Sequence, residues 1–250
     1  MEFFTPYISN FLFILLRAGI VLLLLPVFGS TTFPPAFRVG LAVAIALVLA
    51  PVVQFPTAPA GLVTIIVREV MFGMIFGLAV RFVFFSVEMA GQVMSNATGL
   101  SMATAFNPEM GSSTEISQLY SIIAMLLFLA LDAHHDLIAI FVKSYEWLPA
   151  GTVNVGAMSA AAVAFTTKIF VLAIKLSAPV IIIMLIANIM LGFIYKAAPQ
   201  MNVFFVGYPV YLFLGFTVML IGLPVFVFVL SGYFGGIKDE VAKVILMMRQ

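Results

Sequence analysis

Long, uninterrupted runs of apolar residues constrain this chain more than any other feature. Each run is near or above the length of about 20 residues that a helix needs to cross ~30 Å of hydrocarbon. Only 8% of the 250 residues are charged, whereas about 25% are charged in a typical soluble domain. The sequence therefore predicts an integral membrane protein. The six runs are Phe11–Gly29, Gly40–Phe55, Leu62–Val87, Tyr120–Val142, Ile169–Tyr195 and Val203–Ile237.

The apolar runs favour helices over a β-barrel. Strands of an outer-membrane barrel alternate apolar and polar residues in short segments, but these runs are continuously apolar. We therefore expect one all-α membrane domain over residues 1–250, with about six hydrophobic helical segments. The last run is long enough for a bent or broken helix. Internal prolines indicate helices packed against protein, because the carbonyl groups that proline frees need other partners. They are Pro26, Pro51, Pro179, Pro209 and Pro224.

Composition argues against several classes of function. The chain has no cysteine, which excludes disulfides, thiolate metal sites and cysteine nucleophiles. Its net charge is +1 without a basic tract, so we expect no binding of nucleic acid. No catalytic triad order, phosphate-binding glycine loop or carboxylate pair stands out. We expect no catalytic residues, no cofactor and no enzyme activity.

Small residues recur at intervals of four and predict close helix packing. Gly91, Ser95, Gly99 and Ala103 would form one smooth stripe on a helix, which another backbone could approach closely. Gly73 and Gly77, in "FGMIFG", repeat the same signal upstream. Such spacing is common in membrane helices, so the stripe by itself indicates ordinary packing.

The segment Ser101–Glu115, "SMATAFNPEMGSSTE", is too polar for a helix core and too apolar for a solvated loop. Pro108 and Gly111 are expected to end the preceding helix, while Phe106 and Met110 flank the break. Apolar side chains on a flexible loop could occlude an aqueous path by excluding water. A plain surface connector explains the composition equally well.

Six charged residues fall within the apolar runs. Intramembrane charges are candidates for ion or proton relays by default. Arg81 and Glu88 are seven residues apart on one helix face, whereas Arg68 and Glu69 point about 100° apart, so no carboxylate relay is evident. We expect structural pairing between helices. The six are Arg17, Arg68, Glu69, Arg81, Glu88 and Lys175.

The motif "DAHHD", Asp132–Asp136, contains the residue types that bind metal ions. On a helix, Asp132, His135 and Asp136 would share one face. No fourth ligand is predictable, and these residues could equally cap a helix end near the membrane interface. We expect no metal.

Four stretches, in order along nearly the whole chain, resemble the FliR/SctT family of type III secretion export-gate proteins, in its flagellar form. They are "RAGIVLLLLPVFGSTTFPPAFRVGLAVAIALVLAP", "REVMFGMIFGLAVRFVFFSVEMAGQVMSNATGLSMATAFNPEM", "LFLALDAHHDLIAIFVKSYEWLPAG" and "APVIIIMLIANIMLGFIYKAAPQMNVFFVGYP". Single matches are weak, but their ordered combination with the "FNPEMG" break is specific.

The resemblance implies a core subunit of the flagellar export gate, in the bacterial inner membrane at the basal body. Such a subunit assembles with FliP- and FliQ-like subunits, neighbours FlhB- and FlhA-like components and membrane lipid, and passes unfolded flagellar proteins without catalysis. The family's helices are bent hairpins that enclose a channel. Residues 1–165 would form a FliP-like part with the plug loop, and residues 166–250 a FliQ-like C-terminal hairpin.

The resemblance also assigns a role to the helix-breaking segment. The family's channel plug corresponds to Phe106, Asn107, Pro108, Glu109, Met110, Gly111, Ser112 and Ser113. The alternative is an ion-coupled secondary transporter for a small molecule, which would also use broken helices and buried charges. Against it, the chain has no two matching halves and no evident midplane carboxylate site. A membrane scaffold without transport is a third possibility.

Overall fold

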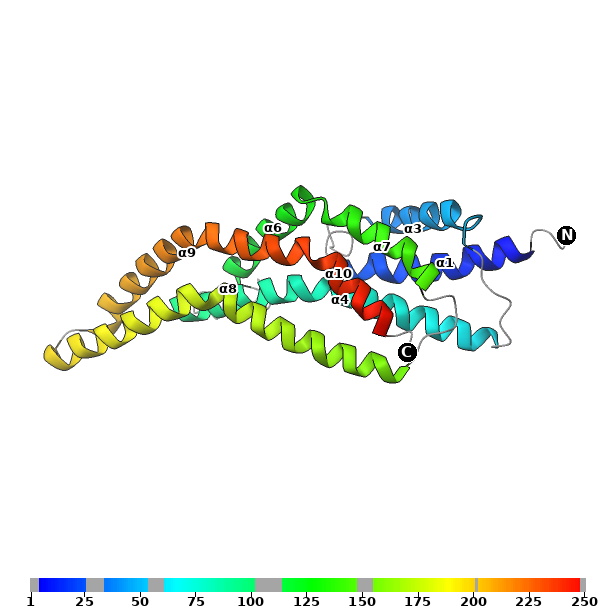
Figure 1. The fold of residues 1–250 in the computed structure, drawn as a ribbon. Helices are drawn as coiled ribbons and strands as arrows, with labels where there is room; N and C mark the ends of the chain where they lie inside the picture. The colour runs from blue at the N-terminus through cyan, green and yellow to red at the C-terminus, as the bar shows by residue number, and fades with distance from the viewer. Residues whose placement is uncertain are drawn as a thin grey trace. The chain divides into compact units, whose positions relative to one another are not determined.

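The computed structural model describes residues 5–25, 34–53, 61–101, 114–147, 155–200 and 202–247. Throughout these ranges the regular elements are α-helices (Figure 1), which confirms the predicted all-α class. They are α1 (Thr5–Leu24), α3 (Pro35–Leu49), α4 (Leu62–Thr98), α6 (Glu115–Ala130), α7 (Ala133–Trp147), α8 (Val155–Ala197), α9 (Val203–Gly235) and α10 (Ile237–Met247).

Each of the six apolar runs is helical over most of its described residues, but the runs are not six equal spans. Within the described residues, four helical stretches are long and apolar enough to cross a membrane: α1, α4, α8, and α9 together with α10. A fifth span is possible if α6 and α7 count as one, although they meet at an angle of 67°. Helix α3 has 15 residues and rises only ~22 Å, which is shorter than the hydrocarbon layer.

The run Tyr120–Val142 is broken because the backbone turns sharply within it. Leu131 and Asp132 separate α6 from α7, and Asp132 has φ of 54°, in the left-handed region that a short polar side chain tolerates. The Asp132 carbonyl then accepts hydrogen bonds from the backbone N–H of His135 (2.9 Å) and Asp136 (3.5 Å) as α7 begins. The polar motif thus lies at a helix junction.

The helices belong to two compact units. The first comprises residues 1–82, 129–167 and 234–250. In it α1 packs on α3, and α10 packs on α7, with Lys238 Nζ 3.6 Å from Asp136 Oδ1. Its core includes the fully buried Ile14, Phe72 and Ile140.

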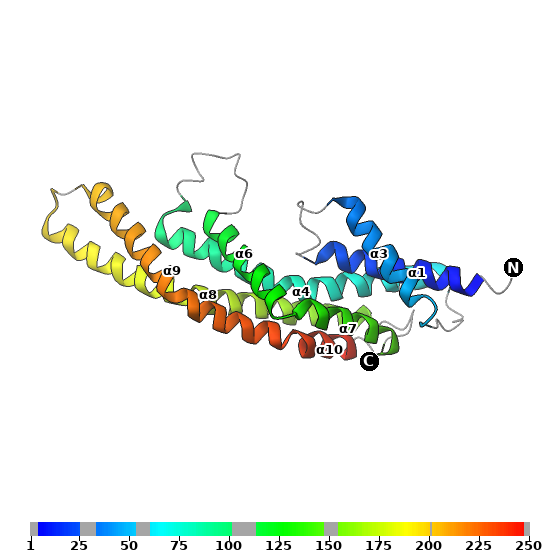
Figure 2. The same cartoon turned by 90° about the horizontal axis from the view of Figure 1, so that it is seen from above.

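The second unit comprises residues 83–128 and 168–233. Here α8 and α9 run antiparallel as a hairpin, visible in both Figure 1 and Figure 2. Tyr120 of α6 packs edge-on against Phe226 of α9, with ring centroids 4.7 Å apart. Both α8 and α9 also carry many exposed, large apolar side chains, for example Phe205 (82% exposed) and Phe228 (78%). Lipid or other subunits must cover such a surface in a membrane.

Candidate functional site

The predicted plug, residues 106–113, lies outside the described residues, and so does Ala103 of the predicted stripe. The structure does describe the two helix ends from which this segment leaves and to which it returns. These ends are Thr98 of α4 and Thr114 before α6, and both belong to the second unit. Their packing is the part of the candidate site that geometry can define.

Helix α4 ends at Thr98. Gly99 has φ of +79°, a left-handed conformation that favours glycine and ends helices. The helix therefore stops before Gly99, about ten residues ahead of Pro108, and Ser101 is helical again after this break. Pro108 and Gly111 lie outside the described residues, so the expectation that they end the preceding helix stays a prediction. Gly99 also does not continue the helical stripe, which on α4 contains only Gly91 and Ser95.

The end of α4 is held closely against α9. A Cβ atom on Gly215 of α9 would overlap Cγ2 of Thr98, and one on Gly99 would lie 3.5 Å from the Tyr208 ring. Thr98 Oγ1 donates a hydrogen bond to Met94 O (3.0 Å), and also lies 3.1 Å from Ser95 O. This side chain is thus satisfied within its own helix, and its methyl group faces the glycine. This contact holds the described end of α4, which precedes the predicted plug in the sequence.

The start of α6 is capped and pressed against α4. The backbone N–H of Ser117 donates a hydrogen bond to Thr114 Oγ1 (3.3 Å), so Thr114 is an N-cap. A Cβ atom on Gly91 would lie 2.5 Å from Ser117 Cα, a distance too short for any side chain. Ser117 Oγ donates a hydrogen bond to Glu88 O (3.1 Å) at the same crossing. The helices on either side of the predicted plug therefore touch backbone to backbone.

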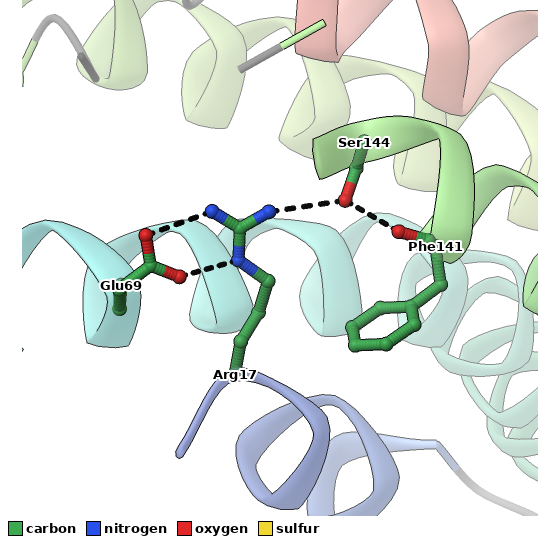
Figure 3. A network of polar contacts seen from close by, with 4 residues as sticks. All are labelled: Arg17, Glu69, Phe141 and Ser144. Atoms are coloured by element: carbon green, nitrogen blue, oxygen red, sulfur yellow. Dashed lines mark hydrogen bonds and ion pairs between the residues drawn. The ribbon is translucent and has the colours of Figure 1, made fainter. Parts of the chain in front are cut away.

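A second candidate site is a buried ion pair in the first unit (Figure 3). Arg17 of α1 and Glu69 of α4 are both fully buried. Arg17 Nε donates to Glu69 Oε2 (2.5 Å) and Nη2 donates to Oε1 (2.8 Å), in a bidentate pair. Arg17 Nη1 also donates to Ser144 Oγ (3.1 Å) of α7, which itself donates to Phe141 O (2.6 Å). The network joins three helices.

Aromatic rings enclose the guanidinium of Arg17. Its Cζ atom lies 4.2 Å from the Phe72 ring centroid and 4.1 Å from the Tyr145 ring centroid. Cation–π attraction favours an arginine between two rings when water is excluded. Together, the carboxylate, the hydroxyl and the rings offset the large cost of removing this charge from water.

The glycines of "FGMIFG" bring α1 close enough for this pair. A Cβ atom on Gly73 would lie 3.1 Å from Ile20 Cβ, and one on Gly77 would lie 2.6 Å from Leu24 Cβ. Glu69, Gly73 and Gly77 are spaced by four and share one face of α4. Sequence reasoning missed the partner of Glu69, although this shared register shows that Glu69 faces the same close-packed helix as the glycines.

The other four intramembrane charges are not part of this buried network. Arg68, Arg81 and Glu88 are half-buried, and Lys175 is exposed on α8.

The metal-ligand residue types that lie close together are not the three that the sequence suggested. Asp132, His134 and His135 place one donor atom each within 4.8 Å of one another.

Asp136 is not in this group and instead forms an ion pair with Lys238. Asp132 lies at the helix break, directly before α7 begins, which is the helix-end position that the sequence offered as the alternative to a metal site. Asp132 Oδ1 lies 3.3 Å from His135 Nδ1 at this exposed junction.

Comparison with known proteins identifies the family. The model for "Bacterial export proteins, family 1" matches residues 8–237. This chain belongs to that family. Flagellar biosynthetic protein FliR of Caulobacter vibrioides is 34% identical over 227 residues, which cover 88% of this chain and 90% of the relative. FliR of Escherichia coli is 27% identical over 229 residues, covering 89% and 87%, and FliR of Bacillus subtilis 25% over 232, covering 90% of each.

The family match covers the structural features described above. The match begins in α1 and ends at the first residue of α10, so it includes the ion pair, the helix crossing and the predicted plug. This export protein is a component of the flagellar export apparatus, in the inner membrane at the basal body. The transporter alternative is not favoured.

Proposed function

We propose that this export protein is a core gate subunit that helps to enclose and plug the channel for unfolded flagellar proteins. Residues 106–113 are the plug, and Phe106 and Met110 form the water-excluding part. The observation that carries the proposal is the close packing of the described helices on either side of this segment. Gly215 and Thr98 fix the helix end before it, and Gly91 and Ser117 fix the helix start after it.

Close packing of the flanking helices is suited to a gate. The flanking backbones keep their positions, while a segment with Pro108, Gly111 and Ser112 between them can leave the path of a passing chain. Hydrophobic constrictions close water-filled paths by dewetting, which needs only a few apolar side chains. The subunit does this without catalysis and without a cofactor.

The partners in this proposal are FliP- and FliQ-like gate subunits and FlhB- and FlhA-like membrane components. Residues 1–165 supply a FliP-like part with the plug, and residues 166–250 supply a FliQ-like hairpin. The large exposed apolar side chains of α8 and α9 support an assembly with other subunits or lipid, since such side chains would be unstable in water.

Deleting Asn107–Ser113 is expected to raise ion leak across the cytoplasmic membrane, because nothing would then occlude the assembled pore. The measurement is membrane depolarisation together with flagellin export, in cells with and without the FliP- and FliQ-like subunits. The smaller change F106S with M110S should raise the ion leak in the same way, whereas S112A with S113A should leave it unchanged.

The outcomes separate the alternatives. Leak that requires the partner subunits supports the plug. Unchanged leak with normal export means that the segment is a connector, and leak without any partner subunit indicates that this chain forms a pore or transporter alone.

A further inference from the structure

The α8–α9 hairpin carries positive charge without any acid of its own. Between Glu146 and Asp239 the sequence contains four lysines and neither aspartate nor glutamate. One of the four, Lys238, pairs with Asp136. Any acid that pairs with one of the other three must therefore come from outside this stretch. The other three are Lys168, Lys175 and Lys196.

Lys175 is the lysine for which this matters most. It lies within the apolar run Ile169–Tyr195 of α8, and its side chain is exposed. The exposed residues around it on this helix are apolar, including Val171, Ile174 and Ile182, which are 46%, 59% and 57% exposed. Among the residues that the structure describes, none forms a hydrogen bond or an ion pair with Lys175.

An unpaired lysine on such a surface is costly. A charged side chain at the centre of a membrane helix costs roughly 2.5–3.5 kcal/mol or more. The other apolar segments show how this chain meets that cost, because Arg17 is buried and bidentate with Glu69. Lys175 has no equivalent within the described residues.

Its depth argues against contact with a lipid headgroup. Three consecutive exposed polar residues, Thr166, Thr167 and Lys168, mark a polar level on α8. Lys175 lies seven residues further along the helix, which is a rise of ~10 Å. Although helical side chains lean toward the N-terminus, a lysine side chain is shorter than this rise. The exposed Phe170 and Ile174 lie between the two levels.

We propose that Lys175 forms an ion pair with an aspartate or glutamate on an apolar helix of a neighbouring subunit of the export apparatus. That helix covers the face of α8 around Val171, Ile174 and Ile182. A carboxylate on an apolar helix complements both properties of this face, its charge and its hydrophobicity. The inference rests on the proposed function, because it needs a subunit assembled with other membrane subunits.

The test is charge reversal at Lys175 in cells, with the full chain expressed from its own locus. K175E is expected to reduce co-purification of the neighbouring gate subunits, and swarming motility, at least tenfold. The matched control is K168E, on the same face of the same helix at the polar level, which should retain both. K175M keeps the length of the side chain without charge, so it should still fold and should lose less than K175E.

Suppressor selection identifies the partner. Motile revertants of K175E are expected to carry an acid-to-base substitution within an apolar segment of another export subunit. Three results would overturn the proposal. They are equal behaviour of K175E and K168E; full function in K175M with no charge-swapping suppressor of K175E, which means that the charge has no partner; and a suppressing swap within this chain. Loss of this chain without loss of flagellin export would instead contradict the proposed function itself.

Discussion

Replacing Glu69 by alanine is expected to destabilise this export protein by about 3–5 kcal/mol, because it leaves the buried Arg17 guanidinium without its carboxylate. The remaining contacts to Ser144, Phe72 and Tyr145 cannot neutralise the charge. The measurement is the melting temperature of the detergent-solubilised protein, with its abundance in the membrane after protein synthesis is stopped. R68A is the matched control, since Arg68 is adjacent and half-buried, and it should change both quantities little.

A double substitution separates a structural pair from a functional relay. R17M with E69M replaces the ion pair by apolar side chains, and such replacements of buried pairs are often neutral or stabilising. We expect the double variant to recover the abundance that E69A loses and to export flagellin. Normal abundance without export would contradict the structural role and assign the charges to the export process.

Replacing Gly91 by alanine is expected to disrupt the crossing of α4 and α6. The new Cβ atom would lie 2.5 Å from Ser117 Cα, and overpacking of this kind costs about 1–3 kcal/mol. Because the atom that the new Cβ meets belongs to the backbone, no change of rotamer relieves the overlap. The helices α4 and α6, which flank the predicted plug, must then move apart. We expect loss of motility and a raised ion leak, measured as for the loop deletion.

Two control variants isolate this effect. G192A adds the same methyl group to α8, where a Cβ atom meets nothing within 4 Å, and it should be tolerated. S117A removes only the hydrogen bond from Ser117 Oγ to Glu88 O, so it should cost about 1 kcal/mol. If G91A behaves like G192A, the close crossing does not position the plug.

The all-helical membrane fold and the family could be predicted from the sequence, because both depend on local properties. Helices form wherever a long apolar run must satisfy its backbone hydrogen bonds away from water. The apolar runs, the glycines of "FGMIFG" and the ordered motifs are visible without any knowledge of which helices meet. The position of the plug follows from the same local comparison and stays a prediction.

Two helix ends could not be located from the runs. The break between α6 and α7 lies inside an apolar run, and its only local sign is the polar motif at Asp132. Helix α4 ends at Thr98, inside a stretch without proline, because Gly99 adopts the left-handed conformation. Glycine permits that conformation but does not require it, so packing against Tyr208 and Gly215 of α9 decides the outcome.

The tertiary structure alone decided which charges meet. Arg17 and Glu69 are 52 residues apart, and Ser144 is 127 residues from Arg17. Their pairing depends on how each helix is rotated about its axis and on how closely α1 approaches Gly73 and Gly77. Hydropathy along the chain reports neither quantity. It distinguishes an apolar helix from a polar segment, whereas the partner of a buried charge is set by contacts between distant segments.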